Sequence, residues 1–371
     1  MIYRKLGTTG LMASQLGFGA MRLPMTGEGI DACVDRERAV PMIHRAFEAG
    51  VNYIDTAVGY CNRDSQRAIG EALRGWRDRI IVSTKNHYYG PDEKEWWKNL
   101  EDSLYRLNID CIDIYSHHGI NWRHYEENVA PRLSAWMQKA RDQGLIRHIC
   151  TSFHDSTEAL VKLVDTGYPE VITLQYNLLN RGLEEGIAYA AEKGIGIVVM
   201  GPVAGGRLGA TSSILEENIP HLRKVPELAL RHVLANPNVS VALSGMSTMS
   251  HVEENISVAS DTPPLTEEQK RLIDDTALRI KELEKLYCTG CGYCEPCPNN
   301  VAISRIFEWY NLGRLYGYWD RATMLYREIG VKENDKRKKA DSCIECGACE
   351  KNCPQNIEII RNLKAAHTDL G

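Results

Sequence analysis

Residues 79–116 read RIIVSTKNHYYGPDEKEWWKNLEDSLYRLNIDCIDIYS, and this stretch contains two short apolar runs on either side of an amphipathic segment. The runs RIIVST (79–84) and CIDIYS (111–116) are rich in β-branched residues, as expected of strands buried on both faces under helices. The segment EKEWWKNLEDSLYRL (93–107) between them has helical character. The stretch therefore predicts a strand–helix–strand unit.

The same alternation continues in both directions along the chain. Further strand candidates are LGFGA (16–20), NYI (52–54), RHICTS (147–152), VITLQ (171–175), GIVVM (196–200) and VSVAL (239–243), and a short hairpin is expected over residues 1–14. Eight strand–helix units over roughly 260 residues have the size and period of a TIM barrel. A doubly wound open sheet is the alternative, and it is disfavoured because no GxGxxG follows a predicted strand.

Eight of the chain's 12 cysteines lie in two runs within its last quarter, each followed by a proline: Cys288, Cys291, Cys294 and Cys297, and then Cys343, Cys346, Cys349 and Cys353. The second run has the spacing C-x2-C-x2-C-x3-C-P, in which three thiolates bind one cubane cluster and the fourth binds a neighbouring cluster. Zinc is the alternative, since C-x2-C pairs also build zinc sites, but it leaves the three-in-a-row spacing unexplained. We therefore predict two 4Fe-4S clusters.

The first run is one residue shorter than this pattern between Cys294 and Cys297. If the fourth cysteine of each run binds the other cluster, the missing residue affects only the segment that leads to that cysteine. The loop that carries the first three thiolates is then intact. One cluster would then be bound by Cys288, Cys291, Cys294 and Cys353, and the other by Cys343, Cys346, Cys349 and Cys297.

The composition changes at DTPPLTEEQK, which begins at Asp261. Pro263 and Pro264 interrupt the strand–helix pattern, and Thr266 can cap a following polar helix. We expect a barrel over residues 1–262, a connecting helix over 263–286 and a small helical ferredoxin-like domain over 287–371.

The charge and the apolar runs of the sequence give no support to a nucleic-acid or membrane partner. The net charge of -5 gives no support to nucleic-acid binding. No apolar run approaches the roughly 18 residues that a membrane span needs. The start MIYRKLGTTG lacks the apolar core of a secretory signal, and cluster ligands must stay reduced, so we expect a cytoplasmic protein.

Reactive side chains occur where three successive predicted strands end. Asp55 ends the second strand with Tyr60 just beyond it, Lys85 ends the third, and His117 and His118 end the fourth. The carboxyl ends of the strands form the mouth where barrel enzymes place their sites. These side chains are therefore expected to converge.

Seven motifs of the first 260 residues or so occur in the order found in the aldo-keto reductase superfamily, which this part of the chain resembles. They are LGFGAMRLP (16–24), NYIDTAVGY (52–60), STK (83–85), SLYRLNIDCIDIYSHH (103–118), QYNLL (175–179), MGPVAGGRL (200–208) and HVEEN (251–255). The tail is similar to that of the iron–sulfur branch of this superfamily, whose members append a dicluster ferredoxin-like domain.

The resemblance implies a catalytic tetrad of Asp55, Tyr60, Lys85 and His118. Tyr60 would protonate the oxygen of a carbonyl that accepts hydride, and Lys85, held by Asp55, is expected to lower the phenol pKa. His118 would stabilise the developing oxyanion. His117 is expected to point to the opposite face and to be structural.

The resemblance also implies a cofactor site. Ser152, Gln175 and Asn177 would flank a nicotinamide, and Glu254 and Asn255 would lie on the adenine side. The phosphates would be received by the loops after the last two strands, with Gly201, Pro202, Gly205, Arg207 and Leu208 in one loop and Ser247 and His251 in the other.

One departure concerns the cofactor's second phosphate. Members that prefer NADPH generally have Lys before the serine and Arg four residues after it, whereas this chain has Met246 and His251. A phosphate dianion needs fixed positive charge, which these residues do not supply. NADH therefore becomes an alternative to NADPH, and so does flavin mononucleotide (FMN) bound by the same loop.

Three functions remain open. The tetrad favours nicotinamide-dependent reduction of a carbonyl or conjugated small molecule. The cysteines favour a flavin-mediated reductase fed with single electrons by a ferredoxin- or flavodoxin-type carrier. The basic run KRKK (336–339) is expected to be a solvated face, with docking of an acidic carrier as the alternative. In the third possibility, the clusters are purely structural. Tyr88, Tyr89, Trp96, Trp97 and Trp122 would wall the mouth for an apolar or aromatic ligand, or Trp96 and Trp97 would pack in the core.

Overall fold

The structure is a computed structural model of the 371-residue chain. It describes residues 1–27, 31–178, 180–203, 225–261, 265–271, 273–275, 294–331, 335–353 and 357–371. The chain divides into two compact units, Met1–Gly206 with Pro226–Leu265, and Arg207–Val225 with Thr266–Gly371. Most of the connecting helix predicted for 263–286 lies outside the described residues.

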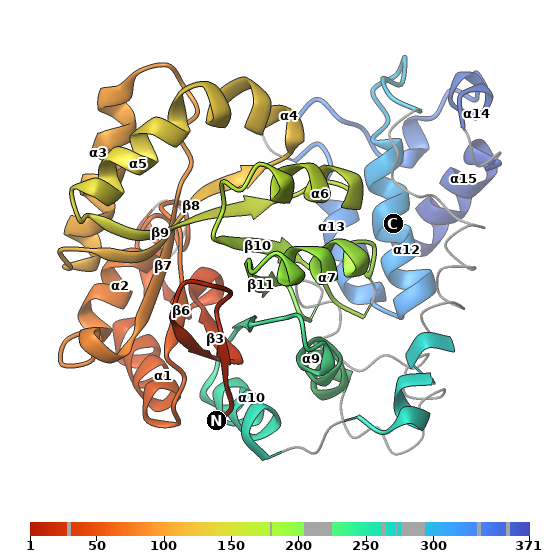
Figure 1. Ribbon diagram of the computed structural model, residues 1–371. Helices are drawn as coiled ribbons and strands as arrows, with labels where there is room; N and C mark the ends of the chain where they lie inside the picture. The colour runs from red at the N-terminus through yellow and green to blue at the C-terminus, as the bar shows by residue number, and fades with distance from the viewer. Residues whose placement is uncertain are drawn as a thin grey trace. The chain divides into compact units, whose positions relative to one another are not determined.

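The first unit is built on a closed barrel of eight parallel strands, which confirms the predicted fold class. The strands are β3 (Leu16–Gly19), β6 (Tyr53–Asp55), β7 (Ile81–Asn86), β8 (Ile112–Ile120), β9 (Ile146–Phe153), β10 (Val171–Gln175), β11 (Gly196–Met200) and β12 (Val241–Gly245). Their order around the barrel follows the chain, and β12 closes it by pairing with β3 (Figure 1).

Helices follow the strands and surround the barrel (Figure 1). They are α1 (Arg36–Glu48), α2 (Ser65–Ala72), α3 (Glu93–Leu107), α5 (Ser134–Asp142), α6 (Thr157–Asp165), α7 (Glu184–Glu192), α9 (Val225–Ala235) and α10 (Met249–Asp261). Short turns lie at Ala20–Arg22 (η1) and Arg77–Arg79 (η3), and α4 (Trp122–His124) leads into the π-helix η4 (Tyr125–Leu133).

Helix α3 shows how the local sequence sets these bounds. The Asp92 side chain caps it by accepting the Lys94 N–H at 2.9 Å, and Asn108 ends it with a left-handed φ of 53°. Its buried residues Trp96, Leu100, Ser103 and Leu107 recur every three or four positions, which gives the helix one face toward the barrel.

Alternation along the strands separates two cores. Tyr53, Ile81 and Ile114 belong to a cluster inside the barrel, whereas their neighbours Ile54 and Val82 pack outward against the helices. Continuing this alternation toward the carboxyl ends places Asp55, Lys85, His118, Ser152 and Gln175 on the inward side.

A hairpin of β1 (Tyr3–Lys5) and β2 (Met12–Ser14) covers the amino end of the barrel. Leu6 and Ala13 belong to the inner cluster. Gly7 has a φ of 56°, and a Cβ there would lie 2.3 Å from the backbone nitrogen of Gly196, so only glycine fits this close approach. The hairpin predicted over residues 1–14 is confirmed.

The segment between β3 and α1 carries its own small sheet. Strands β4 (Met25–Thr26) and β5 (Cys33–Val34) pair there in antiparallel fashion. The segment lies beside the loop that follows Tyr60, to which several hydrogen bonds join it.

The second unit is helical in its described parts, as predicted for the ferredoxin-like domain. Its elements are α12 (Ile303–Tyr316), α13 (Trp319–Arg327), η6 (Ala340–Ser342), α14 (Ala348–Lys351) and α15 (Ile359–Leu370). Tyr326, Leu363 and Ala366 are fully buried between them. Across the described parts of both units, every helix is too short or too polar to cross a bilayer.

Candidate active site at the carboxyl end of the barrel

A buried ion pair lies at the centre of the mouth. Lys85 is 2% exposed, and its Nζ donates to Asp55 Oδ1 at 2.5 Å and to the Thr56 carbonyl at 2.8 Å. The Ser83 hydroxyl donates to the other Asp55 oxygen at 2.8 Å. Burial opposes the charge on Lys85, but Asp55 and Tyr60 outweigh it and leave the Lys85 pKa above its ordinary value. The lysine is therefore a fixed ammonium.

Tyr60 and His118 lie next to this pair. The Lys85 Nζ lies 5.2 Å from the centroid of the Tyr60 ring, and the His118 ring meets the Tyr60 ring edge-on with 6.1 Å between centroids. The structure thus brings together all four side chains predicted from the ends of three strands.

Lys85 lowers the pKa of Tyr60, as predicted, but the net shift of that pKa is upward. Burial raises the pKa of Tyr60 above its ordinary value, and the Lys85 ammonium offsets this only in part, while Asp55 adds to the rise. The phenol therefore keeps its proton at neutral pH. A sequence gives the charges around a phenol but not the degree to which the fold removes it from water.

The two adjacent histidines differ in their surroundings. His118 lies at the mouth, and burial together with the Lys85 charge lowers its pKa to about 4, so it is neutral at physiological pH. His117 is 1% exposed, its Nε2 lies 2.8 Å from the Tyr168 hydroxyl, and burial lowers its pKa to about 3. The His117 side chain packs on the outer side of the barrel against Tyr168, which follows α6, as predicted.

The loop after Tyr60 has an unusual backbone that the sequence did not indicate. Cys61, Asn62 and Arg63 have φ values of 50°, 52° and 68°. Non-glycine residues pay about 1–3 kcal/mol each for such conformations. Glycine would have signalled this turn, and the loop contains none at these positions.

The residues predicted to flank a nicotinamide line the same mouth. Ser152 is 1% exposed on β9, and Gln175 ends β10. Asn177 donates from Nδ2 to the carbonyl of Gly201 at 3.0 Å, which joins the loops after β10 and β11. Pro202 follows Gly201, whereas Gly205, Arg207 and Leu208 lie outside the described residues.

The loop after β12 leads into the amino end of α10. The Ser247 N–H donates to His251 Nδ1 at 3.4 Å, and the Thr248 hydroxyl accepts the His251 N–H at 3.2 Å. Ser250 donates to Glu254 at 3.2 Å, and Asn255 donates to Ser244 at 2.9 Å. A 13-residue helix that begins beside the mouth suits a phosphate anion through its free N–H groups.

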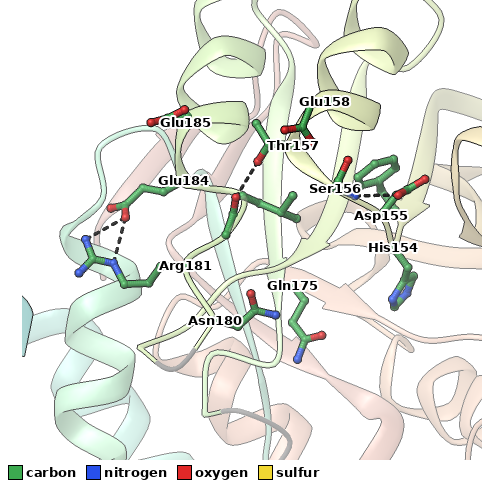
Figure 2. Close-up of a pocket in the computed structure, with 13 residues that line it drawn as sticks. His154, Asp155, Ser156, Thr157, Glu158, Gln175, Asn180, Arg181, Glu184 and Glu185 are labelled. Carbon is green, nitrogen blue, oxygen red and sulfur yellow. Dashed lines mark hydrogen bonds and ion pairs between the residues drawn. The ribbon is translucent and has the colours of Figure 1, made fainter. Parts of the chain in front are cut away.

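A cavity of about 880 Å³ opens beside Gln175, between the loops that follow β9 and β10. Ten of the 13 residues that line it have polar or charged side chains, and Figure 2 shows Asp155, Asn180 and Glu184 among them. Thr157 donates to the Gly182 carbonyl at 2.6 Å and joins the two loops. The cavity adjoins the site predicted for the nicotinamide.

The aromatic residues proposed to wall the mouth divide into two groups. Trp96 is fully buried among Trp97, Tyr115 and Trp136, so the core-packing alternative is correct for it. The Tyr89 hydroxyl donates to the His118 carbonyl, which keeps that tyrosine at the mouth.

In the second unit, the segments that carry Cys297 and Cys343 are joined. Asn299 donates to the Ser342 carbonyl at 2.6 Å, and the Lys338 N–H donates to the Asn300 carbonyl at 2.8 Å. The six described cysteines here form no disulfide with one another: Cys294, Cys297, Cys343, Cys346, Cys349 and Cys353. Cys288 and Cys291 lie outside the described residues.

The loop from Cys343 to Cys349 turns tightly, but in the described part of the chain no three His, Cys, Asp or Glu side chains are placed together so as to hold a metal ion. Glu345 and Gly347 have φ values of 55° and 73°, which turn the chain tightly between the thiols. Burial raises the pKa of the Cys349 thiol, and the neighbouring Cys343 contributes to the rise. Positive iron bound to both thiolates would relieve this cost.

Comparisons with known proteins agree with these features. A model of the aldo/keto reductase family matches residues 15–277, and a model of the 4Fe-4S dicluster domain matches residues 287–358. L-galactose dehydrogenase of Arabidopsis thaliana is 30% identical over 302 residues, 74% of this chain and 93% of that protein. NADH-specific methylglyoxal reductase of Escherichia coli is 26% identical over 304 residues, 68% of this chain and 91% of that protein.

A solved structure is also similar. It is an aldo-keto reductase from Bacillus halodurans in its holo form, which is 29% identical and superposes with a TM-score of 0.64 over 74% of this chain and 96% of that one.

Proposed function

Because the chain belongs to the aldo/keto reductase family and carries a C-terminal 4Fe-4S dicluster domain, we propose that it reduces a carbonyl or conjugated small molecule at Tyr60 with electrons from a nicotinamide. The family makes it an oxidoreductase. The observation that supports this site is the buried Asp55–Lys85 pair beneath Tyr60.

In this proposal each of the four side chains has a task. A bound reduced nicotinamide would supply the hydride, and the carbonyl oxygen that gains negative charge takes a proton from the Tyr60 hydroxyl. The Lys85 ammonium then stabilises the phenolate, and Asp55 holds Lys85 in place. Neutral His118 donates a hydrogen bond that orients the carbonyl.

The residues at the mouth fit a dinucleotide. The amino end of α10 and Ser247 would hold phosphate, Glu254 and Asn255 would contact the adenine, and Gln175 and Asn177 would flank the nicotinamide. The cavity beside Gln175 adjoins the nicotinamide side of this site, but none of the four tetrad residues lines it (Figure 2). The names of the two relatives, a sugar dehydrogenase and a methylglyoxal reductase, favour a small polar substrate.

The clusters supply single electrons when present, and we propose that they connect the enzyme to a ferredoxin- or flavodoxin-type carrier, which implies a cytoplasmic location. The hydrogen bonds between the Cys297 and Cys343 segments favour ligation of one cluster by Cys297, Cys343, Cys346 and Cys349. The other would take Cys288, Cys291, Cys294 and Cys353. There are two competing proposals: FMN binds in place of the nicotinamide, or the clusters are purely structural. Release of flavin on denaturation would favour bound FMN.

Replacing Tyr60 by Phe tests the proposal. Loss of the proton donor should lower kcat for carbonyl reduction by about 10²–10⁴-fold, with binding of NADH nearly unchanged. In the wild type, reduction should slow as pH rises through the Tyr60 pKa, which burial raises, and as pH falls below about 4, where His118 becomes charged. In the Tyr60→Phe variant, the decrease in rate at high pH should be absent.

Tyr105→Phe, on the exposed side of α3, is the matched control and should leave kcat unchanged. Turnover by the Tyr60→Phe variant within a few-fold of the wild type would show that the tetrad does not carry the reaction.

A further inference from the structure

Three consecutive residues directly after Tyr60 hold a left-handed backbone, and none of them is glycine. Cys61, Asn62 and Arg63 form this turn with φ values of 50°, 52° and 68°. L-amino acids avoid this region because Cβ approaches the backbone carbonyl, and runs of it are rare outside glycine. The turn persists only if neighbouring groups impose it.

An ion pair at the end of the turn supplies much of this constraint. Arg36 Nη1 and Nη2 donate to the two Asp64 carboxylate oxygens at 2.6 and 2.8 Å, and the Val34 N–H donates to the same carboxylate at 2.8 Å. Arg36 also donates to the Val34 carbonyl and to Glu71, both at 3.0 Å. The bidentate contact fixes the direction of Asp64 as well as its distance.

Two further contacts join the turn to the segment between β3 and α1, residues 20–35. Asn62 Nδ2 donates to the Ala32 carbonyl at 3.0 Å, and the Ser65 hydroxyl donates to the Ala20 carbonyl at 2.8 Å. The Ser65 N–H donates in turn to the carbonyl of Tyr60 at 3.3 Å. Ser65 thus connects the Tyr60 carbonyl to the segment that follows β3.

We propose that Arg36 and Asp64 are positioning residues for Tyr60. Their bidentate pair holds the left-handed turn that sets the phenol beside Lys85 and His118, and without it the turn relaxes and the phenol shifts. This inference rests on the proposed role of Tyr60 as the proton donor.

Arg36→Lys in the full-length holoenzyme is the first test, with NADH and methylglyoxal as the probes. Lysine keeps the charge but loses the two-pronged contact. A shift of the phenol by about 1 Å should lower kcat by about 10–100-fold, with KM for methylglyoxal within about threefold.

Arg45→Lys is the matched control. Arg45 also lies on α1 and makes a similar two-pronged contact, to Glu253 at 2.6 and 2.9 Å, but does not contact the turn. Its kcat should equal that of the wild type.

Arg63→Gly in the Arg36→Lys background separates positioning from stability. Glycine adopts the left-handed conformation at no steric cost, so the double variant should recover at least about threefold in kcat. A pair that only stabilises the fold would give a higher Tm in the double variant with no recovery of kcat.

Two results would overturn the inference: equal kcat for Arg36→Lys and Arg45→Lys, or a double variant that melts higher without regaining kcat. Equal rates for the wild type and Tyr60→Phe would instead reject the proposed function, and the positioning role with it. An inactive Tyr60→Phe enzyme beside a fully active Arg36→Lys enzyme rejects the positioning role alone.

Discussion

Met246 and His251 occupy the positions at which the proposed cofactor site would bind the additional phosphate of NADPH. Met246 is 0% exposed and packs in the outer core, so it cannot contact a phosphate. The His251 ring nitrogen Nδ1 accepts the Ser247 N–H at 3.4 Å. Neither residue therefore presents fixed positive charge at the amino end of α10.

We expect no strong preference for NADPH over NADH. A charge-assisted contact to phosphate is worth about 1.5–3 kcal/mol, and two such contacts are missing. His251→Arg should strengthen NADPH binding while leaving NADH binding nearly unchanged. Fluorescence titration of flavin-free protein with both nicotinamides measures this, and a preference of the wild type for NADPH above about a hundredfold, or about 2.7 kcal/mol, would contradict it.

At the level of single residues, the sequence predicted which polar side chains meet but not their energetics. Asp55, Lys85 and His118 converge because strand ends of a parallel barrel share one mouth, and this follows from pattern alone. The pKa of Tyr60 depends on burial by loops whose course no periodicity describes. The left-handed turn after Tyr60 was missed for a related reason, since Arg36, which pairs with Asp64 at the end of the turn, lies 24 positions before Tyr60 in the sequence.

Among the secondary-structure elements, the hairpin that covers the amino end of the barrel is joined to the end of α9 by one side chain. Arg4 donates to the carbonyls of Leu234, Asn236 and Val239 at 2.6, 3.2 and 2.7 Å. These carbonyls lie at and just beyond the end of α9, where they have no partner within the helix. Arg4 thus joins the first strand of the chain to the last part of the barrel.

Replacing Arg4 by Ala should lower the free energy of unfolding by about 1.5–3 kcal/mol, because charged hydrogen bonds to three carbonyls are lost. The active site lies at the opposite end, so kcat should not change. Urea denaturation measures the loss. Lys5→Ala, on the exposed neighbouring residue, is the control, and equal stabilities for the two variants would show that Arg4 does not hold the hairpin.

Strand centres were predicted well, and their ends less well. The run RIIVST was expected to begin at Arg79, but Arg77–Arg79 form a turn in which Arg77 donates to the Cys111 carbonyl and pairs with Asp113. Strand β8 continues to Ile120, past the predicted end at Ser116, through a shift of register. Both differences arise from contacts with distant segments.

For the whole molecule, the two cysteine runs make a quantitative prediction about metal content. Two 4Fe-4S clusters require about eight irons per chain. Cys346→Ser should reduce this to about four and destabilise the second unit, because cluster binding and folding are coupled in small metal domains.

Iron content after anaerobic purification is the measurement. Cys33→Ser is the control, since Cys33 is exposed on β5 in the first unit and should not alter the iron content. Zinc in place of iron would contradict the prediction.

The closure of the barrel by β3 and β12 has a consequence for synthesis on the ribosome. Leu16 pairs with Ala242, so roughly 225 residues must be translated between the two partners. At about 5–20 residues per second this takes on the order of 10–45 s. Throughout this interval one edge of β3 has unpaired backbone N–H and C=O groups, which favour pairing with other nascent chains. The protein is therefore expected to need chaperone protection until β12 has left the exit tunnel.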